Sequence, residues 1–395
     1  MSSEKTSDII AALDLGSNSF HLIVARKNET GYRVIDKHKE TVRLASGFDT
    51  RGNLKPQVLE KAVKSLERLG ERVRKIPSRN LRIVGTNSLR KAKNANILIE
   101  VAENMLGHSV DVIAGAEEAR LIFSGVTRDL NLGNTKYLVI DIGGGSTEII
   151  AGLNEKPQRL NSLHMGCISV TLEHFPKGTL SSNAFDAAYT SVAQELEPIT
   201  LSYKEHGWDE VIGSSGTVLA IRDLLVKNDW ERDGISKESL NYLTDYLISV
   251  GSTKRLKIKG LSENRRAILP GGLAILNGFF REMAIDRLAV SDNALREGVL
   301  NDLVGRIKNQ DIRDQTVRKF LKVYELFVRH KNDEDFQKIQ SKTLIMTGEH
   351  DIGSTIEMSQ QLNNIIENSE LKIIKDGKHL CGIECADDVN LAIKN

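Results

Sequence analysis

Short apolar runs alternate with amphipathic stretches along most of the chain. The run at residues 9–15 (IIAALDL) is followed by Gly, a pattern typical of a buried strand that enters a turn. Residues 19–26 and 32–42 are predicted to form two further strands, so the chain opens with a three-stranded meander. Pro56 then begins a stretch to about residue 75 whose apolar residues share one helical face.

The alternation of strands and helices continues after this helix. We predict strands at residues 81–85 and 110–113, and helices at residues 94–106 and 116–128. Strands that alternate with helices in this way are typical of an α/β fold. The first part of the chain is therefore predicted to have an α/β fold.

The opening meander is repeated later in the chain. Residues 14–19 (DLGSNS) correspond to residues 141–146 (DIGGGS), and each of these turns lies between two predicted strands. An internal repeat of this kind predicts two similar α/β lobes that face each other across a cleft. We expect the first lobe to span residues 1–130 and the second to span residues 131–310.

The repeated turn has the residue types of a phosphate-binding site. Glycine lets the backbone approach a ligand closely and adopt a positive φ, and successive free N–H groups in such a turn bind anions. Asp14 and Asp141 are carboxylates of the kind that holds a divalent cation against phosphate oxygens. One such turn is explained equally well as a plain hairpin turn. Two copies that both keep the aspartate favour a pair of turns that hold one phosphate chain from two sides.

Two glutamates, Glu117 and Glu118, open the helix predicted at residues 116–128. Negative side chains are stabilised by the dipole at a helix N-terminus, which is a purely structural explanation. The alternative is that one carboxylate is a general base that orients a water for attack on a terminal phosphate. From the residues alone, both explanations stay open.

The composition narrows the class of protein. The chain has 395 residues, of which 40% are apolar and 27% charged, and its formal net charge is +1. A general nucleic-acid-binding protein has a basic excess, so we expect no nucleic-acid partner. Three cysteines are too few for a disulfide framework and lack the spacing of a zinc site, which indicates a reducing compartment.

Targeting segments are not evident either. The first residues (MSSEKTSDII) lack the pattern of a signal peptide, and no apolar run has the length of a transmembrane span. We therefore expect a cytoplasmic protein. Peripheral association with the inner membrane and the oligomeric state are left open.

Several motifs occur in an order that resembles a known family. They are DLGSNSFHLIV, GTNSLRKAKNAN, IAGAEEARLIFSGV, VIDIGGGSTEII, LHMGCISV, IGSSGTV, ILPGG and DNALREGVL. Over residues 8 to about 320, the sequence is similar to the exopolyphosphatase / guanosine pentaphosphate phosphatase family, within the superfamily of actin, sugar kinases and heat-shock ATPases. The resemblance implies an α/β fold of two actin-like (ribonuclease H-like) lobes around a central cleft. It also implies Mg²⁺-dependent hydrolysis of a terminal phosphate with release of orthophosphate.

The resemblance implies roles for particular residues. Glu118 corresponds to the catalytic glutamate that activates the attacking water. Asp141 and Glu148 correspond to an acidic pair associated with Mg²⁺ and catalysis, and Arg90 to an arginine that contacts phosphate. The two phosphate-binding turns correspond to Asp14, Ser17, Asn18, Ser19, Gly143, Gly144, Gly145 and Ser146.

Two substrates are compatible with this family. We expect an exopolyphosphatase that removes terminal phosphate from inorganic polyphosphate by glutamate-activated attack of water. The alternative is a guanosine pentaphosphate (pppGpp) 5′-phosphohydrolase. A kinase on the same scaffold and a non-hydrolytic nucleotide- or polyphosphate-binding protein fit less well. The combination of Glu118, Asp141 and Glu148 is that of a hydrolase.

A basic stretch and a cysteine each have two explanations. Residues 254–266 carry six cations and a single Glu. They form either a solvated helix face or a track for a long polyanion, whose binding would depend steeply on salt. Cys167, in the motif MGC, either packs beside the cleft or takes part in catalysis.

The last part of the chain departs from the family pattern. Residues 311–324 look like the beginning of the helical domain found in full-length members, but the pattern then changes. Residues 341–395 resemble the C-terminal end of an α/β-hydrolase, in which Asp351 and His379 match the acid and the histidine of a catalytic triad. No G-x-S-x-G elbow supplies the serine, so we expect both residues to be inert.

We therefore expect a chimeric C-terminus. Residues 311–340 are predicted to be a remnant of the truncated helical domain and a linker, with the junction near residues 324–335. Residues 341–395 are predicted to be an α/β fragment, because two strands and two helices bury little core on their own. The family's helical domain lengthens the polyphosphate channel, so its absence favours short chains or the nucleotide as substrates.

Overall fold

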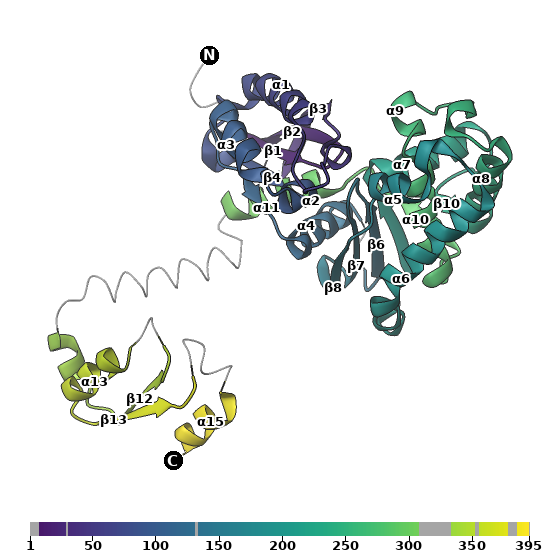
Figure 1. The fold of residues 1–395 in the computed structure, drawn as a ribbon. Helices are drawn as coiled ribbons and strands as arrows, with labels where there is room; N and C mark the ends of the chain where they lie inside the picture. The colour runs from purple at the N-terminus through teal and green to yellow at the C-terminus, as the bar shows by residue number, and fades with distance from the viewer. Residues whose placement is uncertain are drawn as a thin grey trace. The chain divides into compact units, whose positions relative to one another are not determined.

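The structure, a computed structural model, describes residues 8–28, 31–130, 133–307, 333–351, 355–377 and 385–394. The chain forms two units, residues 1–311 and 312–395. The first unit holds two β-sheets with their helices, and the second holds a two-stranded sheet with short helices (Figure 1).

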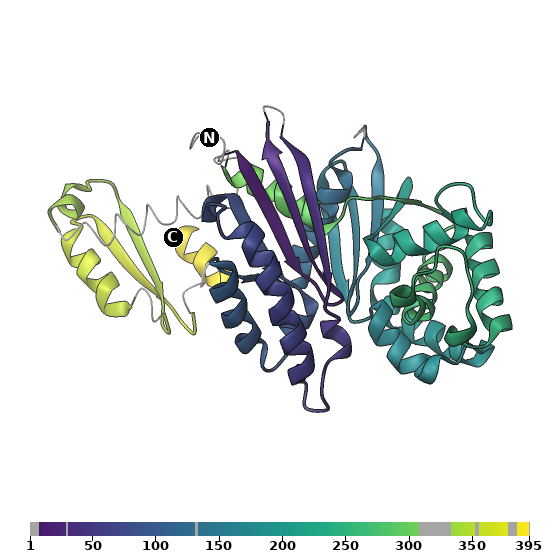
Figure 2. The same cartoon turned by 90° about the horizontal axis from the view of Figure 1, so that it is seen from above.

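The first sheet contains the predicted meander. Its elements and the helices beside it are β1 (Ile9–Leu15), β2 (Ser19–Lys27), β3 (Tyr32–Thr41), α1 (Pro56–Val73), β4 (Leu81–Gly85), α2 (Asn87–Lys91), α3 (Ala95–Leu106) and β5 (Asp111–Val112). The strand order is β3-β2-β1-β4-β5, with β1, β2 and β3 antiparallel and β4 and β5 parallel to β1. Helices α1 and α3 cover one face of this sheet, where Leu13, Leu66 and Leu98 share a buried cluster (Figure 2).

The second sheet repeats this topology. Its strands are β6 (Lys136–Ile142), β7 (Thr147–Leu153), β8 (Lys156–Leu163), β9 (Glu210–Ser214), β10 (Ile235–Ser236) and β11 (Arg287–Val290). Along the order β8-β7-β6-β9-β11, the first three strands are antiparallel and the last two are parallel to β6, as in the first sheet. The two similar α/β lobes that the repeat predicts are therefore confirmed.

Helices make up most of the remaining second lobe. They are α5 (Cys167–His174), α6 (Ser182–His206), α7 (Ser215–Lys227), α8 (Lys237–Val250), α9 (Glu263–Arg266) and α10 (Leu269–Glu282). Helix α10 packs on α5, α6, α7 and α8, and every residue from Leu269 to Phe280 is buried. A helix that is apolar on all sides belongs at the centre of a lobe, which is where α10 lies.

Two helices join the lobes. Helix α4 (Gly115–Thr127) contacts β6, β7 and β8 of the second sheet, and α11 (Leu295–Ile307) contacts α4 and the strands β1, β2 and β4. The predicted boundaries place residues 295–307 in the second lobe, but their apolar face packs on the first. Leu295 and Val299 share a buried cluster with Ile10 and Ile23 because α11 returns across the first sheet.

The second unit contains the elements predicted for the tail. They are β12 (Thr343–Gly348), α13 (Ile356–Ile365), β13 (Ser369–Ile374) and α15 (Ala386–Lys394), and β12 pairs with β13 in parallel. Asp351 is buried, whereas His379, residues 311–324 and Asn332 lie outside the described residues. The resemblance of this unit to an α/β-hydrolase stays a prediction.

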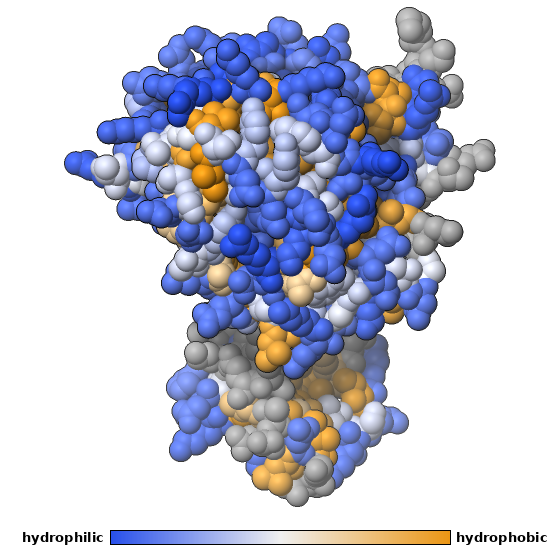
Figure 3. Space-filling model, turned by 90° about the vertical axis from the view of Figure 1, so that its right-hand side faces the viewer, coloured by the Kyte–Doolittle hydropathy of each residue, from blue (hydrophilic) through white to orange (hydrophobic). Residues whose placement is uncertain are grey.

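In the part of the chain that the structure describes, neither the surface visible in Figure 3 nor the helix lengths show a large apolar region. The face of the first unit in Figure 3 is mainly hydrophilic, with apolar residues in small separate groups. Within the described ranges, no helix combines the length and the apolar character that crossing a membrane requires.

Candidate active site

A cavity of about 370 Å³ is lined by residues of both lobes. The repeated turns lie on it, together with the first turn of α4 and the first turns of α7 and α11. The predicted site residues that line it are Asp14, Ser17, Asn18, Ser19, Glu118, Asp141, Gly143, Gly144, Ser146 and Glu148. Two predicted residues, Arg90 and Gly145, are not part of its lining.

The two turns approach each other closely. A Cβ added to Gly144 would lie 3.3 Å from Ser17 Cβ and 3.5 Å from Asn18 N, and one added to Gly145 would lie 3.0 Å from Asn87 Oδ1. Gly166, the N-cap residue of α5, lies against the backbone of Gly144 from the other side. Side chains larger than hydrogen would therefore separate the turns.

The glycines meet a need for space rather than for a special backbone conformation. All residues of both turns are described, and none has the positive φ that the sequence analysis expected there. The cavity residue with a positive φ is Ser215 (φ 88°), at the start of α7. Its Oγ accepts hydrogen bonds from Thr217 N (3.1 Å) and Val218 N (3.3 Å), which stabilises the left-handed backbone at this position.

Four carboxylates from both lobes form an acidic cluster: Asp14, Glu118, Asp141 and Glu148. Asp141 accepts a hydrogen bond from Ser214 Oγ, and Glu148 accepts one from Ser162 Oγ at 2.8 Å. Asp14 Oδ1 is buried and has no hydrogen-bond partner among the described residues. This oxygen of the acidic cluster is therefore available to a ligand.

Arg90 holds Glu118 in place. The Arg90 Nη1 group donates to Glu118 Oε2 at 2.7 Å and to the carbonyl oxygen of Ile113 at 2.8 Å. Glu118 is only 6% exposed, and this contact fixes one of its oxygens at the cavity edge. Arg90 thus contacts a site residue, and the contact with phosphate that the resemblance implies stays a prediction.

Burial raises the pKa of every carboxyl in the acidic cluster. The pKa of Asp14 rises to about 8 and that of Asp141 to about 6, in both cases chiefly by desolvation. Burial also raises the pKa of Glu118, against the opposing effect of Arg90, and the pKa of Glu148, with further increases from the charges of Glu118 and Asp141. When the carboxyls of the acidic cluster are ionised, nearby positive groups therefore do not balance their negative charge.

A divalent cation fits the acidic cluster. Hard cations such as Mg²⁺ bind carboxylate oxygens, and a cation would offset the cost of ionising several buried carboxyls. The free Oδ1 of Asp14 and the neighbouring carboxylates of Asp141 and Glu148 supply suitable oxygens. The residues present thus match the metal that the family resemblance implies.

A basic cluster that the sequence analysis did not assign to the site lines the same cavity: Lys39, Arg265 and Arg296 around His21. The Arg296 Nη1 group lies 3.0 Å from His21 Nδ1. Burial and the neighbouring cations lower the pKa of His21 and of Lys39. Nearby negative groups do not balance the positive charge of the basic cluster. This part of the cavity therefore favours an anion.

Two sequence features contained signals for the basic cluster. Arg296 belongs to the motif DNALREGVL, and Arg265 belongs to the basic stretch at residues 254–266. Of the six cations in that stretch, Arg265 alone lines the cavity. Lys254, Arg255, Lys257 and Lys259 are exposed, so the structure favours a solvated surface over a continuous polyanion track for most of it.

Cys167 lines the cavity from the first residue of α5. It is buried, and its burial raises the pKa of the thiol. A buried protonated thiol is a poor nucleophile. The position therefore fits the packing explanation of this cysteine.

The sequence of residues 23–307 matches a model of the Ppx/GppA phosphatase family. This chain belongs to that family. A guanosine-5′-triphosphate,3′-diphosphate pyrophosphatase of Vibrio campbellii is 36% identical over 348 residues, which cover 88% of this chain and 69% of the relative. A protein of the same name from Aeromonas salmonicida is 37% identical over 324 residues, or 82% of this chain and 65% of the relative.

Solved structures agree with the fold of this Ppx/GppA family member. An exopolyphosphatase from Cytophaga hutchinsonii superimposes with a TM-score of 0.68 at 23% identity, covering 75% of this chain and 97% of that chain. The Aquifex aeolicus PPX-GPPA enzyme superimposes with a TM-score of 0.62 at 23% identity, covering 74% and 99%. The predicted fold of two actin-like lobes is confirmed, and the family assigns the chain to the phosphoanhydride hydrolases.

Proposed function

We propose that this protein is a Mg²⁺-dependent hydrolase that removes the terminal 5′-phosphate of guanosine pentaphosphate. The observation that carries the proposal is the placement of an acidic and a basic cluster on one cavity, together with the two repeated turns. The acidic cluster suits a metal-bound terminal phosphate, and the basic cluster suits the further phosphates of the same molecule.

The site residues that were predicted from the sequence have the following roles in this proposal. Glu118, held by Arg90, accepts a proton from the water that attacks the terminal phosphorus. Its raised pKa suits a base that works near neutral pH. Asp141 and Glu148, with Asp14, would hold the cation, which would neutralise oxygens of the transferred phosphate when bound.

The two turns supply the remaining stabilisation of charge. Ser17, Ser19 and Ser146 line the cavity that the phosphates would occupy. We propose that their hydroxyls and backbone N–H groups of the turns donate to phosphate oxygens. Fixed donors of this kind stabilise the developing charge without reorganisation. Asn18, Gly144 and Gly145 are proposed to contribute through the backbone and through the close contact of the turns. The Gly143 N–H donates to the carbonyl oxygen of Ser146 at 2.9 Å and so shapes its own turn.

The choice of substrate differs from the first expectation from sequence. The relatives that match over most of this chain are named for the guanosine compound, and the basic stretch does not form a continuous track. Both observations favour guanosine pentaphosphate over long polyphosphate. Inorganic polyphosphate remains the second candidate, because its phosphates would meet the same two clusters and a structural neighbour is an exopolyphosphatase.

A direct comparison of substrates tests the proposal. Purified protein is given guanosine pentaphosphate, short polyphosphate or long polyphosphate in turn, with Mg²⁺ or with EDTA, and orthophosphate is measured. We expect Mg²⁺-dependent release with the highest kcat/KM on the nucleotide. A higher kcat/KM on polyphosphate would select the second candidate, and no release from any substrate by the folded protein would contradict both.

A further inference from the structure

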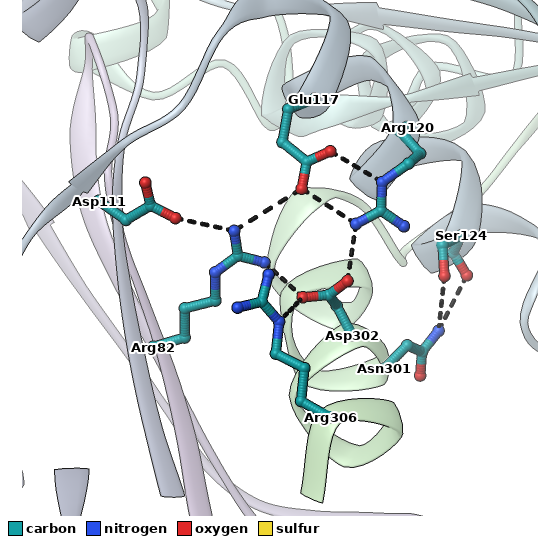
Figure 4. Close-up of polar contacts among 8 residues, drawn as sticks. All are labelled: Arg82, Asp111, Glu117, Arg120, Ser124, Asn301, Asp302 and Arg306. Atoms are coloured by element: carbon teal, nitrogen blue, oxygen red, sulfur yellow. Dashed lines mark hydrogen bonds and ion pairs between the residues drawn. The ribbon is translucent and has the colours of Figure 1, made fainter. Parts of the chain in front are cut away.

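The two adjacent glutamates at the start of α4 face different surroundings. Glu118 lines the cavity, whereas Glu117 does not line it and its carboxylate joins an ionic network, which Figure 4 shows. Neighbours in a helix are rotated by about 100°, so one turn can present both faces. The site therefore uses Glu118 alone, and the function of Glu117 needs a separate explanation.

Four residues, which we call the clasp, form the centre of this network: Arg82, Glu117, Arg120 and Asp302. Arg120 donates to both oxygens of Glu117, at 2.8 and 3.0 Å, and to Asp302 Oδ1 at 2.7 Å. Arg82 donates to Asp302 Oδ2 at 2.6 Å, and its Nη2 lies 3.7 Å from Glu117 Oε1. Both arginines thus bridge the first turn of α4 to Asp302 on α11.

The clasp is shielded from water at its centre. The side chain of Asp302 is 6% exposed and that of Arg82 is 9% exposed. Asp302 also accepts from Arg306 Nε at 2.7 Å, and the three arginines hold its pKa below the usual range. Buried pairs with several satisfied hydrogen bonds define one geometry more firmly than exposed pairs do.

The elements that the clasp joins are those that carry site residues. Glu118 follows Glu117 directly in α4, and Arg296 of the basic cluster lies in the first turn of α11, which also carries Asp302. Further along, the backbones of the two helices meet closely at Gly125 and Gly298. The clasp joins the same two helices at a second place, next to the proposed general base.

We propose that Asp302 and Glu117 are positioning residues for the hydrolysis of the terminal phosphate. Through Arg82 and Arg120 they fix the first turn of α4, and thereby the carboxylate of Glu118 relative to the cavity. The inference rests on the proposed function of Glu118 as the base. It assigns Glu117 and Arg120 of the motif EEAR to the clasp and leaves Glu118 as the residue of that motif that acts on water.

The test compares three variants of the full-length protein. Asp302→Asn and Glu117→Gln keep the shape of the side chain but remove one negative charge from the clasp. Asn301→Ala is the matched control, since Asn301 Nδ2 donates to the carbonyl oxygen of Ser124 at 2.9 Å and so joins α11 to α4 further from Glu118. Circular dichroism and thermal melting establish which variants are folded.

We expect Asp302→Asn to lower kcat about 100-fold, because a general base displaced by about 1 Å loses this much, while KM changes less than about twofold. Glu117→Gln should act in the same direction, and it provides the test if Asp302→Asn does not fold. Asn301→Ala should leave kcat and KM unchanged. In a Glu118→Gln background, Asp302→Asn should cause no further loss of the residual rate, because both changes act through the same carboxylate.

Several results would overturn the inference. Unchanged kcat in folded Asp302→Asn and Glu117→Gln, with active wild-type protein, would reject the clasp alone. An equal loss in Asn301→Ala, or a full additional loss in the Glu118→Gln background, would show general loosening of the helices. Wild-type protein that releases no phosphate from either substrate would reject the proposed function, and the positioning role with it.

Discussion

Asp141 and Glu148 are directly paired across the antiparallel strands β6 and β7, whereas the equivalent pair on β1 and β2 is Asp14 and His21. The side chains of directly opposite residues in such a pair lie on the same face of the sheet. The second lobe therefore offers two carboxylates where the first offers one beside a histidine. This asymmetry within the repeat favours the second lobe as the main source of ligands for the proposed cation.

Binding of Mg²⁺ should accordingly depend on the pair in the second lobe. We expect Mg²⁺ to raise the melting temperature of the wild-type protein, since a ligand at about 100 times its Kd stabilises by about 2.7 kcal/mol. Asp141→Asn should abolish most of this shift. Asp186→Asn, at an exposed position on α6, is the control and should retain it. A full Mg²⁺ shift in the Asp141→Asn protein would contradict the proposed ligand.

The metal-free protein should lose stability as the pH rises. The pKa of Asp14 in the folded protein is about 8, well above that of an unfolded aspartate, so the native state holds more protons between these values. The free energy of unfolding in EDTA should therefore fall from pH 6 to pH 8, by at most about 1.4 kcal/mol per pH unit for this group.

Asp14→Asn should reduce this dependence between pH 6 and pH 8 without removing it, because the pKa values of Glu118 and Glu148 are also raised in the folded protein. Saturating Mg²⁺ should also reduce the slope in the wild-type protein, since the cation offsets the buried charge. Denaturant unfolding at several pH values measures both effects. Stability that rises with pH in EDTA would contradict the assignment of raised pKa values to the acidic cluster.

The repeat and its turns could be predicted from sequence because they depend on local pattern. The strands at residues 9–15 and 81–85 and the pairing of the two repeated turns follow from short apolar runs and turn residues. The basic cluster could not be predicted in this way. Lys39, Arg265 and Arg296 come from β3, α9 and α11, and only the folded chain brings them together.

The return of α11 to the first lobe was missed for a similar reason. Its apolar positions predict a buried face, but they do not identify the sheet that buries it. The contact with the first lobe also depends on the close approach of Gly125 and Gly298, which lie far apart in the sequence. A positive φ was expected at the turn glycines because that is a frequent use of glycine, and here the crowding of two turns determines the residue instead.

Replacement of the proposed general base should separate binding from turnover. We expect Glu118→Gln to lower kcat about 100- to 10,000-fold, the range that general base catalysis contributes. The affinity for a non-hydrolysable substrate analogue should change little, since the amide keeps the shape of the side chain. Glu100→Gln, at an exposed position of α3, is the control. Wild-type turnover in Glu118→Gln would exclude this residue as the base.

The contact between the turns should be sensitive to single methyl groups. A Cβ at Gly166 would clash with the backbone of Gly144, so we expect Gly166→Ala to cost about 1–3 kcal/mol of stability and to lower kcat/KM. Gly305→Ala in α11 is the matched control, because no atom lies within 4 Å of its added Cβ. That change should stabilise the protein by up to about 1 kcal/mol. Equal kcat/KM in the two variants would show that spacing of the turns does not matter.

The second unit should be dispensable for phosphate release. Every residue proposed for the site lies before the end of α11 at Ile307, and residues 1–311 form a unit by their own contacts. A chain that ends at residue 311 should keep kcat/KM for its preferred substrate within about twofold of the full-length value. Its main thermal transition should occur at the same temperature.

A chain that ends at residue 294 provides the contrast. It lacks α11, whose buried Val299, Leu300 and Leu303 complete the cluster around Ile10 and Ile23. Removal of this many core side chains should prevent cooperative folding, because truncating even one buried leucine to alanine costs about 2–5 kcal/mol. Loss of phosphate release in the folded 1–311 chain would instead assign a catalytic or binding role to the second unit.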